Sequence, residues 1–134
     1  MGTPVTCSAC QSVSGVSYFL NSGNACVSTC PDIVGLPQYG NAGTGNCATC
    51  DASCATCNGG NANNCLTCVA SKYLAFGLNT CGSTCPDGQY FPSGVQICYE
   101  CNVNCVTCSG TSTTCLSCGN SVNGLTLYLY VPTS

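Results

Sequence analysis

Six cysteines crowd the stretch from Cys47 to Cys68, which reads CATCDASCATCNGGNANNCLTC. A second block, from Cys98 to Cys118, reads CYECNVNCVTCSGTSTTCLSC. Both follow the pattern C-x2-C-x3-C-x2-C, then a short spacer of Gly, Ser, Thr and Asn, then C-x2-C. Apart from the cysteines, the two blocks share little more than scattered Asn, Thr and Leu. What repeats is therefore a frame of cysteines, and this frame limits what the chain can fold into.

The chain has many cysteines and few large apolar side chains. Cysteine accounts for 18 of 134 residues, whereas there are three Phe, one Met and no Trp. A continuous core built from so little apolar surface cannot offset the entropy lost on ordering this many residues. Disulfides, each contributing roughly 2–4 kcal/mol, have to do so instead. We expect a small disulfide-rich fold: an elongated rod of tandem modules with short β ladders, mostly loop and no central core.

The number of cysteines and the charge limit where the protein can be located and which partners it can bind. Dense disulfides persist in secreted and cell-surface proteins. The residues from Met1 to Pro4 lack the basic and apolar regions of a signal peptide, so an extracellular location is inferred from the cysteines alone. No apolar run approaches the roughly 20 residues that a transmembrane span needs. One basic residue against four acidic ones excludes nucleic acid as a partner, because phosphates could not be neutralised.

Further segments also recur along the chain. The sequence C-VST-C-P-D at Cys26–Asp32 returns as C-GST-C-P-D at Cys81–Asp87, and equivalent cysteines lie about 50 to 58 residues apart. A fixed period of this size indicates an array of repeats. We expect three parts: a partial first repeat at 1–49, a complete repeat at 50–100, and a partial third repeat at 101–134 that includes an apolar C-terminal strand.

Local patterns predict little regular structure. Short apolar stretches at 17–20, 73–76 and 89–91 predict strands of two or three residues. The Gly- and Asn-rich segment before Cys47 is expected to be a loop. The strongest strand signal is LTLYLYV at 125–131. It is either the opening strand of a third repeat or an edge that pairs with a neighbouring molecule.

The cysteines could instead bind zinc or form a redox-active site, but neither alternative agrees with the sequence. Structural zinc sites use four ligands each, but 18 does not divide by four and the chain has no histidine. A thioredoxin-type enzyme needs C-x2-C at the start of a helix beside a sheet, and no such context exists. Without histidine, and with four scattered acids, hydrolysis has no base. We therefore expect no enzyme, no metal and no cofactor.

The frame of cysteines resembles the furin-like cysteine-rich repeats of growth-factor-receptor ectodomains, over nearly the whole chain. The most specific element is the six-cysteine block followed by a tyrosine-containing spacer and C-x3-C-P-D. Within that superfamily, the Asn-, Thr- and Ala-rich filling and the low charge are most similar to ciliate immobilisation-type surface antigens. The cysteine spacing alone does not choose among the many connectivities; the resemblance does. It implies these pairs: Cys10–Cys26, Cys30–Cys47, Cys50–Cys57, Cys54–Cys65, Cys68–Cys81, Cys85–Cys98, Cys101–Cys108 and Cys105–Cys115.

Cys7 and Cys118 are left without an implied partner. Three explanations stay open: the chain is an excerpt of a longer array, the two residues join copies head to tail, or pairing at the ends is rearranged or incomplete. Cys7 occupies the place of Cys65 in its block, and Cys118 the place of Cys68.

Two functions are compatible with these observations. The first is structural: an extracellular coat or filament subunit whose copies self-associate through uncharged faces. The second is a ligand- or partner-binding ectodomain of a surface receptor or antigen, for which no aromatic or charged hot spot stands out in the sequence. No N-x-[ST] sequon occurs, so any sugar is expected on Ser and Thr hydroxyls.

Overall fold

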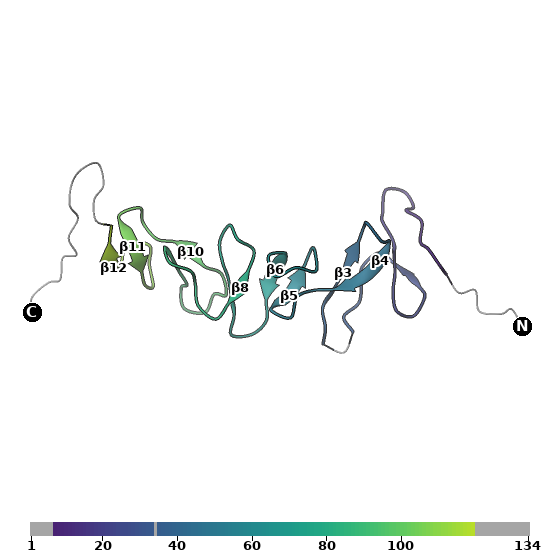
Figure 1. Ribbon diagram of the computed structural model, residues 1–134, viewed down its shortest axis with the longest axis horizontal. Helices are drawn as coiled ribbons and strands as arrows, with labels where there is room; N and C mark the ends of the chain where they lie inside the picture. The colour runs from purple at the N-terminus through teal and green to yellow at the C-terminus, as the bar shows by residue number, and fades with distance from the viewer. Residues whose placement is uncertain (1–6, 34, 120–134) are drawn as a thin grey trace, which may run out of the picture. The chain divides into compact units, whose positions relative to one another are not determined.

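The computed structural model describes residues 7–33 and 35–119. In these residues there are no helices, only twelve strands of two or four residues joined by loops (Figure 1). The expected class, a small disulfide-rich fold of short strands and mostly loop, is confirmed. The C-terminal strand expected at 125–131 lies outside the described residues.

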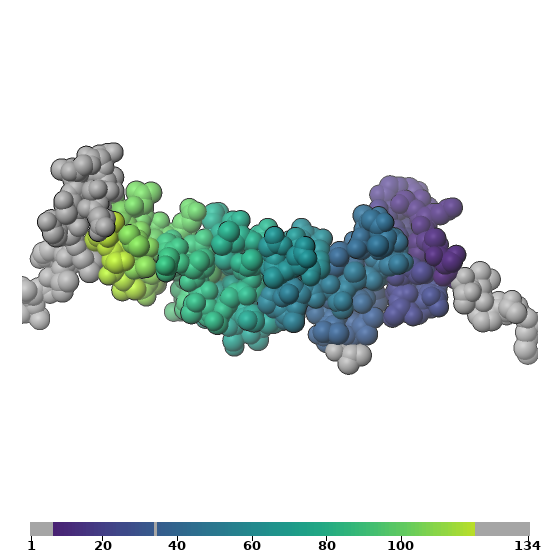
Figure 2. Space-filling view, in the orientation of Figure 1, coloured from purple at the N-terminus to yellow at the C-terminus, as the bar shows by residue number. Residues whose placement is uncertain are grey.

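The chain divides into two compact units, Met1–Val69 and Ala70–Ser134. Figure 2 shows that, within each unit, segments that are neighbours in the sequence also lie side by side at the surface. The three-part division expected at 49/50 and 100/101 stays a prediction. The first unit contains β1 (Phe19–Leu20), β2 (Cys26–Val27), β3 (Gln38–Asn41), β4 (Asn46–Thr49), β5 (Cys54–Cys57) and β6 (Cys65–Cys68). The second contains β7 (Tyr73–Leu74), β8 (Cys81–Gly82), β9 (Gln89–Tyr90), β10 (Tyr99–Glu100), β11 (Cys105–Cys108) and β12 (Cys115–Cys118).

A four-stranded sheet with the order β2-β1-β4-β3 opens the first unit. Strand β3 and the first residue of β4 lie in the segment before Cys47, where a loop was expected, so that expectation was wrong. The reason is the turn between the strands. Asn41 Oδ1 accepts hydrogen bonds from the backbone N–H groups of Gly43 at 2.9 Å and Thr44 at 3.3 Å, and Gly45 takes a φ of +70°. These residues are typical of turns, and here the turn joins two paired strands.

Gly40 in β3 makes room for an aromatic ring. A Cβ atom at this position would overlap three ring atoms of Phe19. Gly40→Ala is therefore expected to displace the ring and lower the free energy of unfolding by about 1–3 kcal/mol, as overpacking usually does. The measurement is chemical denaturation followed by tyrosine fluorescence. The matched control is Gly23→Ala, because its nearest atom would be Asn21 Oδ1 at 3.4 Å. Equal losses in the two variants would contradict the role of the ring.

The cysteine blocks form bulged hairpins, β5–β6 and β11–β12. In a regular strand, residues i and i+3 point to opposite faces, yet Cys54 and Cys57 are both buried. Ala55 and Leu66 explain this, since each is an extra residue without a partner in the ladder, and a bulge of one residue shifts the alternation. In β11–β12 the extra residues are Val106 and Leu116. The paired residues are Cys54 with Cys68, Thr56 with Thr67, Cys57 with Cys65, Cys105 with Cys118, Thr107 with Ser117, and Cys108 with Cys115.

Sulfur fills the interior of the described residues. Apart from Ala75, every buried residue is a cysteine, and no polar or charged residue is buried. The buried cysteines are Cys30, Cys54, Cys57, Cys65, Cys68, Cys98, Cys105 and Cys108. The expected absence of an apolar core therefore matches the packing seen in each unit.

Two small ladders, β7–β8 and β9–β10, support the second unit. A parallel bridge between Leu74 and Ile97 connects β7 to the segment just before β10, with Leu74 N–H donating to the Gln96 carbonyl at 2.9 Å. The strands predicted within 17–20, 73–76 and 89–91 are confirmed as β1, β7 and β9.

Candidate functional site

Sixteen of the 18 cysteines are in disulfides, and all 18 lie within the described residues. Cys7 and Cys118 are free thiols, each half-buried. Cys68 and Cys81 are also disulfide-bonded. The pairs within the units are Cys10–Cys26, Cys30–Cys47, Cys50–Cys57, Cys54–Cys65, Cys85–Cys98, Cys101–Cys108 and Cys105–Cys115.

An aromatic surface forms in the second unit, where sequence reasoning found no hot spot. The rings of Tyr73 and Phe91 are stacked, with centroids 4.0 Å apart and an angle of 22° between their planes. Tyr90 precedes Phe91 in the chain, and Tyr99 lies in β10. The centroids of their rings are 6.2 Å apart, and the two rings are tilted relative to each other. Phe91 and Tyr99 are 40% and 42% exposed. Aromatic side chains that remain this exposed are typical of binding surfaces.

Gln89 holds the loop between β7 and β8 against β9. The Phe76 N–H donates to Gln89 Oε1 at 3.0 Å, and Gln89 Nε2 donates to the Phe76 carbonyl at 2.9 Å. Both backbone groups of Phe76 are thereby satisfied, as in a strand ladder. The Phe76 side chain stays 54% exposed. The start of β9 is fixed in turn by Cys101 N–H, which donates to the Gly88 carbonyl at 2.8 Å.

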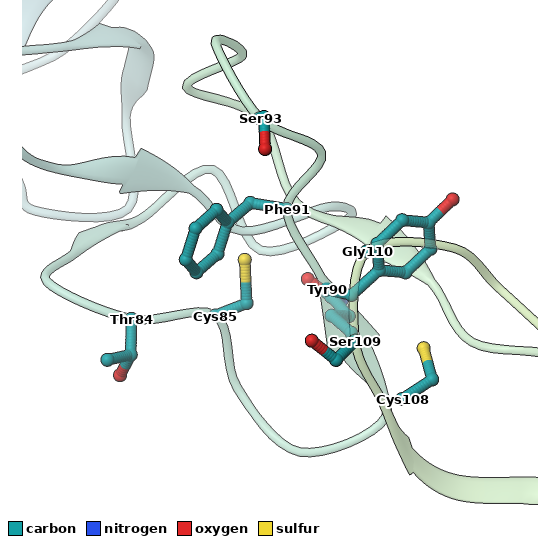
Figure 3. Close-up of a pocket in the computed structure, with 9 residues that line it drawn as sticks. Thr84, Cys85, Tyr90, Phe91, Ser93, Cys108, Ser109 and Gly110 are labelled. Atoms are coloured by element: carbon teal, nitrogen blue, oxygen red, sulfur yellow. The ribbon is translucent and has the colours of Figure 1, made fainter. Parts of the chain in front are cut away.

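A cavity of about 280 Å³, called here the aromatic hollow, lies beside these rings. Figure 3 shows the Phe91 ring on the same side as Cys85, and the Tyr90 ring on the opposite side of the strand. A second cavity of about 400 Å³ also uses Phe91, together with Tyr73. The aromatic hollow is lined by Thr84, Cys85, Gln89, Tyr90, Phe91, Ser93, Cys108, Ser109 and Gly110.

The lining of the aromatic hollow suits binding better than catalysis. It offers aromatic faces and the hydroxyls of Thr84, Ser93 and Ser109, without a carboxylate or a basic group. A hydroxyl nucleophile needs a nearby base to activate it, and none lines this cavity. In the described residues no group of three or more metal-ligating side chains is close enough to hold an ion. One sequence signal was available: five of the ten aromatic residues fall between Tyr73 and Tyr99.

A second surface feature is the bulge patch, defined as Val103, Val106 and Leu116. These side chains are 89%, 48% and 60% exposed, respectively. Val106 and Leu116 are the extra residues of the β11–β12 hairpin, whereas Cys105 and Cys108 of the same hairpin are buried. The corresponding residue of the first unit, Leu66, is 51% exposed.

None of the residues in 7–33 and 35–119 belongs to a helix that is long and apolar enough to cross a membrane. No protein-family model matches the chain. Relatives nevertheless share about a third of its residues over most of its length.

Three of these relatives indicate the kind of sequence this is. Cysteine repeat modular protein 2 of Tetrahymena thermophila is 33% identical over 116 residues, which are 85% of this chain and 6% of that protein. Furin-like protease 2 of Drosophila melanogaster is 34% identical over 115 residues, or 86% of this chain and 6% of that protein. The human extracellular matrix organizing protein FRAS1 is 32% identical over 112 residues, or 84% of this chain and 2% of that protein.

The chain thus spans only a small part of the relatives it matches. Human proprotein convertase subtilisin/kexin type 6 is 32% identical over 93 residues, or 69% of this chain and 9% of that protein, and the regions matched in such convertases are cysteine-rich and not catalytic. The many disulfides and these relatives fit an extracellular module. Over most of its length the chain is therefore similar to furin-like cysteine-rich repeat regions, and this similarity supports its place in the furin-like cysteine-rich repeat family.

Proposed function

We propose that this chain is part of a structural extracellular protein, a subunit of a cell-surface coat or an extracellular filament. Copies of the chain associate through surfaces that carry almost no charge. The observation that carries the proposal is the bulge patch, three exposed apolar side chains in a chain with only five charged residues. Like charges normally keep copies of a protein apart, and here few are present to do so. A second copy of the chain is the occupant that such an uncharged patch fits.

Light scattering and electron microscopy of the purified protein test this proposal. The wild type is expected to grow in mass with concentration and to form fibres or sheets. Val106→Asp with Leu116→Asp places two carboxylates on the bulge patch, which should raise the concentration needed for assembly roughly tenfold or more, equivalent to about 1.4 kcal/mol. Both side chains are exposed, so the fold should be kept.

The control carries the same two charges elsewhere. Ser83→Asp with Thr113→Asp changes exposed residues outside the bulge patch, and its assembly should differ little from that of the wild type. Equal weakening in both variants would show that net charge matters rather than the patch. A wild type that stays dispersed at every concentration would overturn the assembly proposal.

A ligand- or partner-binding ectodomain is the second candidate, and the aromatic hollow favours it. The stacked Tyr73 and Phe91 rings and the neighbouring hydroxyls suit an uncharged partner, such as an apolar side chain of an extended peptide. Dispersed single particles in the microscope would favour this function over assembly.

Several finer features belong to the same proposal. They are the elongated rod, the disulfide pairing including Cys68 with Cys81, the likeness to ciliate surface antigens, O-linked sugar and the lack of catalysis. Tetrahymena thermophila is a ciliate, so the relative from this organism supports the likeness to ciliate surface antigens. Small-angle scattering tests the rod, and peptide mapping without reductant tests the pairing. The intact mass compared with 13.5 kDa tests for sugar.

A further inference from the structure

A free thiol lies against a disulfide near the start of the described chain. Cys7 Sγ is 3.9 Å from Cys26 Sγ, and Cys26 is bonded to Cys10. Only Cys7 carries a hydrogen in this contact, because the other two sulfurs are in the disulfide. Cys26 is exposed and Cys7 is half-buried, so solvent reaches the group. For Cys118, the other free thiol, the described residues show no comparable sulfur contact.

The chain can accommodate either pairing of Cys26. Cys7 and Cys10 belong to one C-x2-C, which keeps both close to the same partner. The present disulfide closes a sequence separation of 16 residues, and Cys7 with Cys26 would close one of 19. Loop-closure entropy changes with the logarithm of loop length. The two loops therefore differ little in entropy, and nothing in the loop length prevents exchange.

We propose that Cys7, Cys10 and Cys26 form a thiol–disulfide exchange site. The Cys7 thiolate attacks Cys26 Sγ, a bond between these two sulfurs forms, and the bond between Cys26 and Cys10 breaks. Cys10 leaves as a thiolate and takes up a proton in place of the one that Cys7 lost. One disulfide and one thiol exist before and after the step, so no external oxidant is needed. The result is a reactive thiol that moves between Cys7 and Cys10.

This inference goes beyond the structural function, and it does not depend on assembly. It adds a site of covalent reactivity at which the first C-x2-C can present either of its cysteines. A low-molecular-weight thiol reagent, or a thiol of another protein, would then meet two reactive positions rather than one.

Trapping of free thiols in the native protein tests the proposal. The protein is incubated with N-ethylmaleimide in mildly alkaline buffer, quenched in acid, digested with pepsin and mapped by tandem mass spectrometry. Exchange predicts label on Cys10 as well as Cys7, together with a peptide pair joined by Cys7–Cys26. In Cys7→Ser the label on Cys10 should disappear, while Cys118 is labelled as before. Label on Cys7 and Cys118 alone in the wild type would overturn the proposal.

A second variant tests the geometry without relying on the exchange rate. Cys10→Ser, folded under oxidising conditions, should join Cys7 to Cys26 and leave Cys118 as its single free thiol. Without this pairing three thiols would be counted: Cys7, Cys26 and Cys118. The matched control is Cys101→Ser, which frees Cys108; in the described residues Cys108 has no sulfur contact with a free thiol like that of Cys7 with Cys26, so this variant should give three. Three thiols in Cys10→Ser would likewise overturn the proposal.

Discussion

Complete reduction and alkylation of the cysteines is expected to unfold both units. Within residues 7–33 and 35–119 the buried residues are eight cysteines and Ala75, so this part of the reduced chain has no apolar interior to hold it together. Each of the eight disulfides contributes roughly 2–4 kcal/mol for loops of this size, whereas the whole stability of a domain is typically about 5–15 kcal/mol. The sum of the disulfide contributions exceeds any stability that the remaining contacts supply.

Near-ultraviolet circular dichroism and amide hydrogen exchange measure this loss. The tyrosine signal should collapse, and slow exchange should disappear from the strands. Alkylation without reductant is the control, because it modifies only two thiols per molecule and leaves eight disulfides in place, so both signals should stay intact. A reduced and alkylated chain that keeps protected amides would contradict the view that sulfur bonds hold the fold.

Replacing Cys54 and Cys65 together by alanine is expected to cause the largest loss from a single disulfide. Their exposed fractions are 0% and 1%, and they join the two strands of the β5–β6 hairpin. The free energy of unfolding should fall by roughly 2–5 kcal/mol, as when native disulfides are removed from small secreted domains. Thermal denaturation followed by circular dichroism measures the change.

The double variant Cys10→Ala with Cys26→Ala is an informative comparison. Its disulfide spans 16 residues, against 11 for Cys54–Cys65, so loop entropy alone predicts a larger loss at the longer loop. Cys26 is exposed, so burial predicts the opposite order. We expect burial to dominate, and a larger loss in the Cys10 and Cys26 variant would refute this.

The sequence was most informative where cysteine count alone decides the outcome. The small disulfide-rich class follows from many cysteines and few large apolar residues. Strands β1, β7 and β9 could be predicted because their apolar residues cluster. Strands β5, β6, β11 and β12 were missed, although they are among the longest, because their bulges break the alternation by which a strand is recognised. The pairing of the cysteines came from a resemblance and not from the spacing.

The stacked pair Tyr73 and Phe91 beside the aromatic hollow could not be predicted because its two rings are distant in the sequence. The bridge between Leu74 and Ile97 and the Gln89 contacts with Phe76 bring their segments together. Neither interaction has a local signature. The turn at Asn41–Gly45 was recognisable, but its composition does not reveal that the flanking residues pair as β3 and β4.

In the bulged hairpins, different residues form the covalent links and the exposed surface: the cysteines form the disulfides, and extra residues of the strands are exposed. Leu66 and Leu116 take no part in the ladder and are more than half exposed, while the cysteines of both hairpins form the disulfides Cys54–Cys65 and Cys105–Cys115. Mutations there can change the chemistry of the exterior while leaving the covalent links untouched. An array of such hairpins can therefore diversify its outer face, repeat by repeat, at little risk to folding.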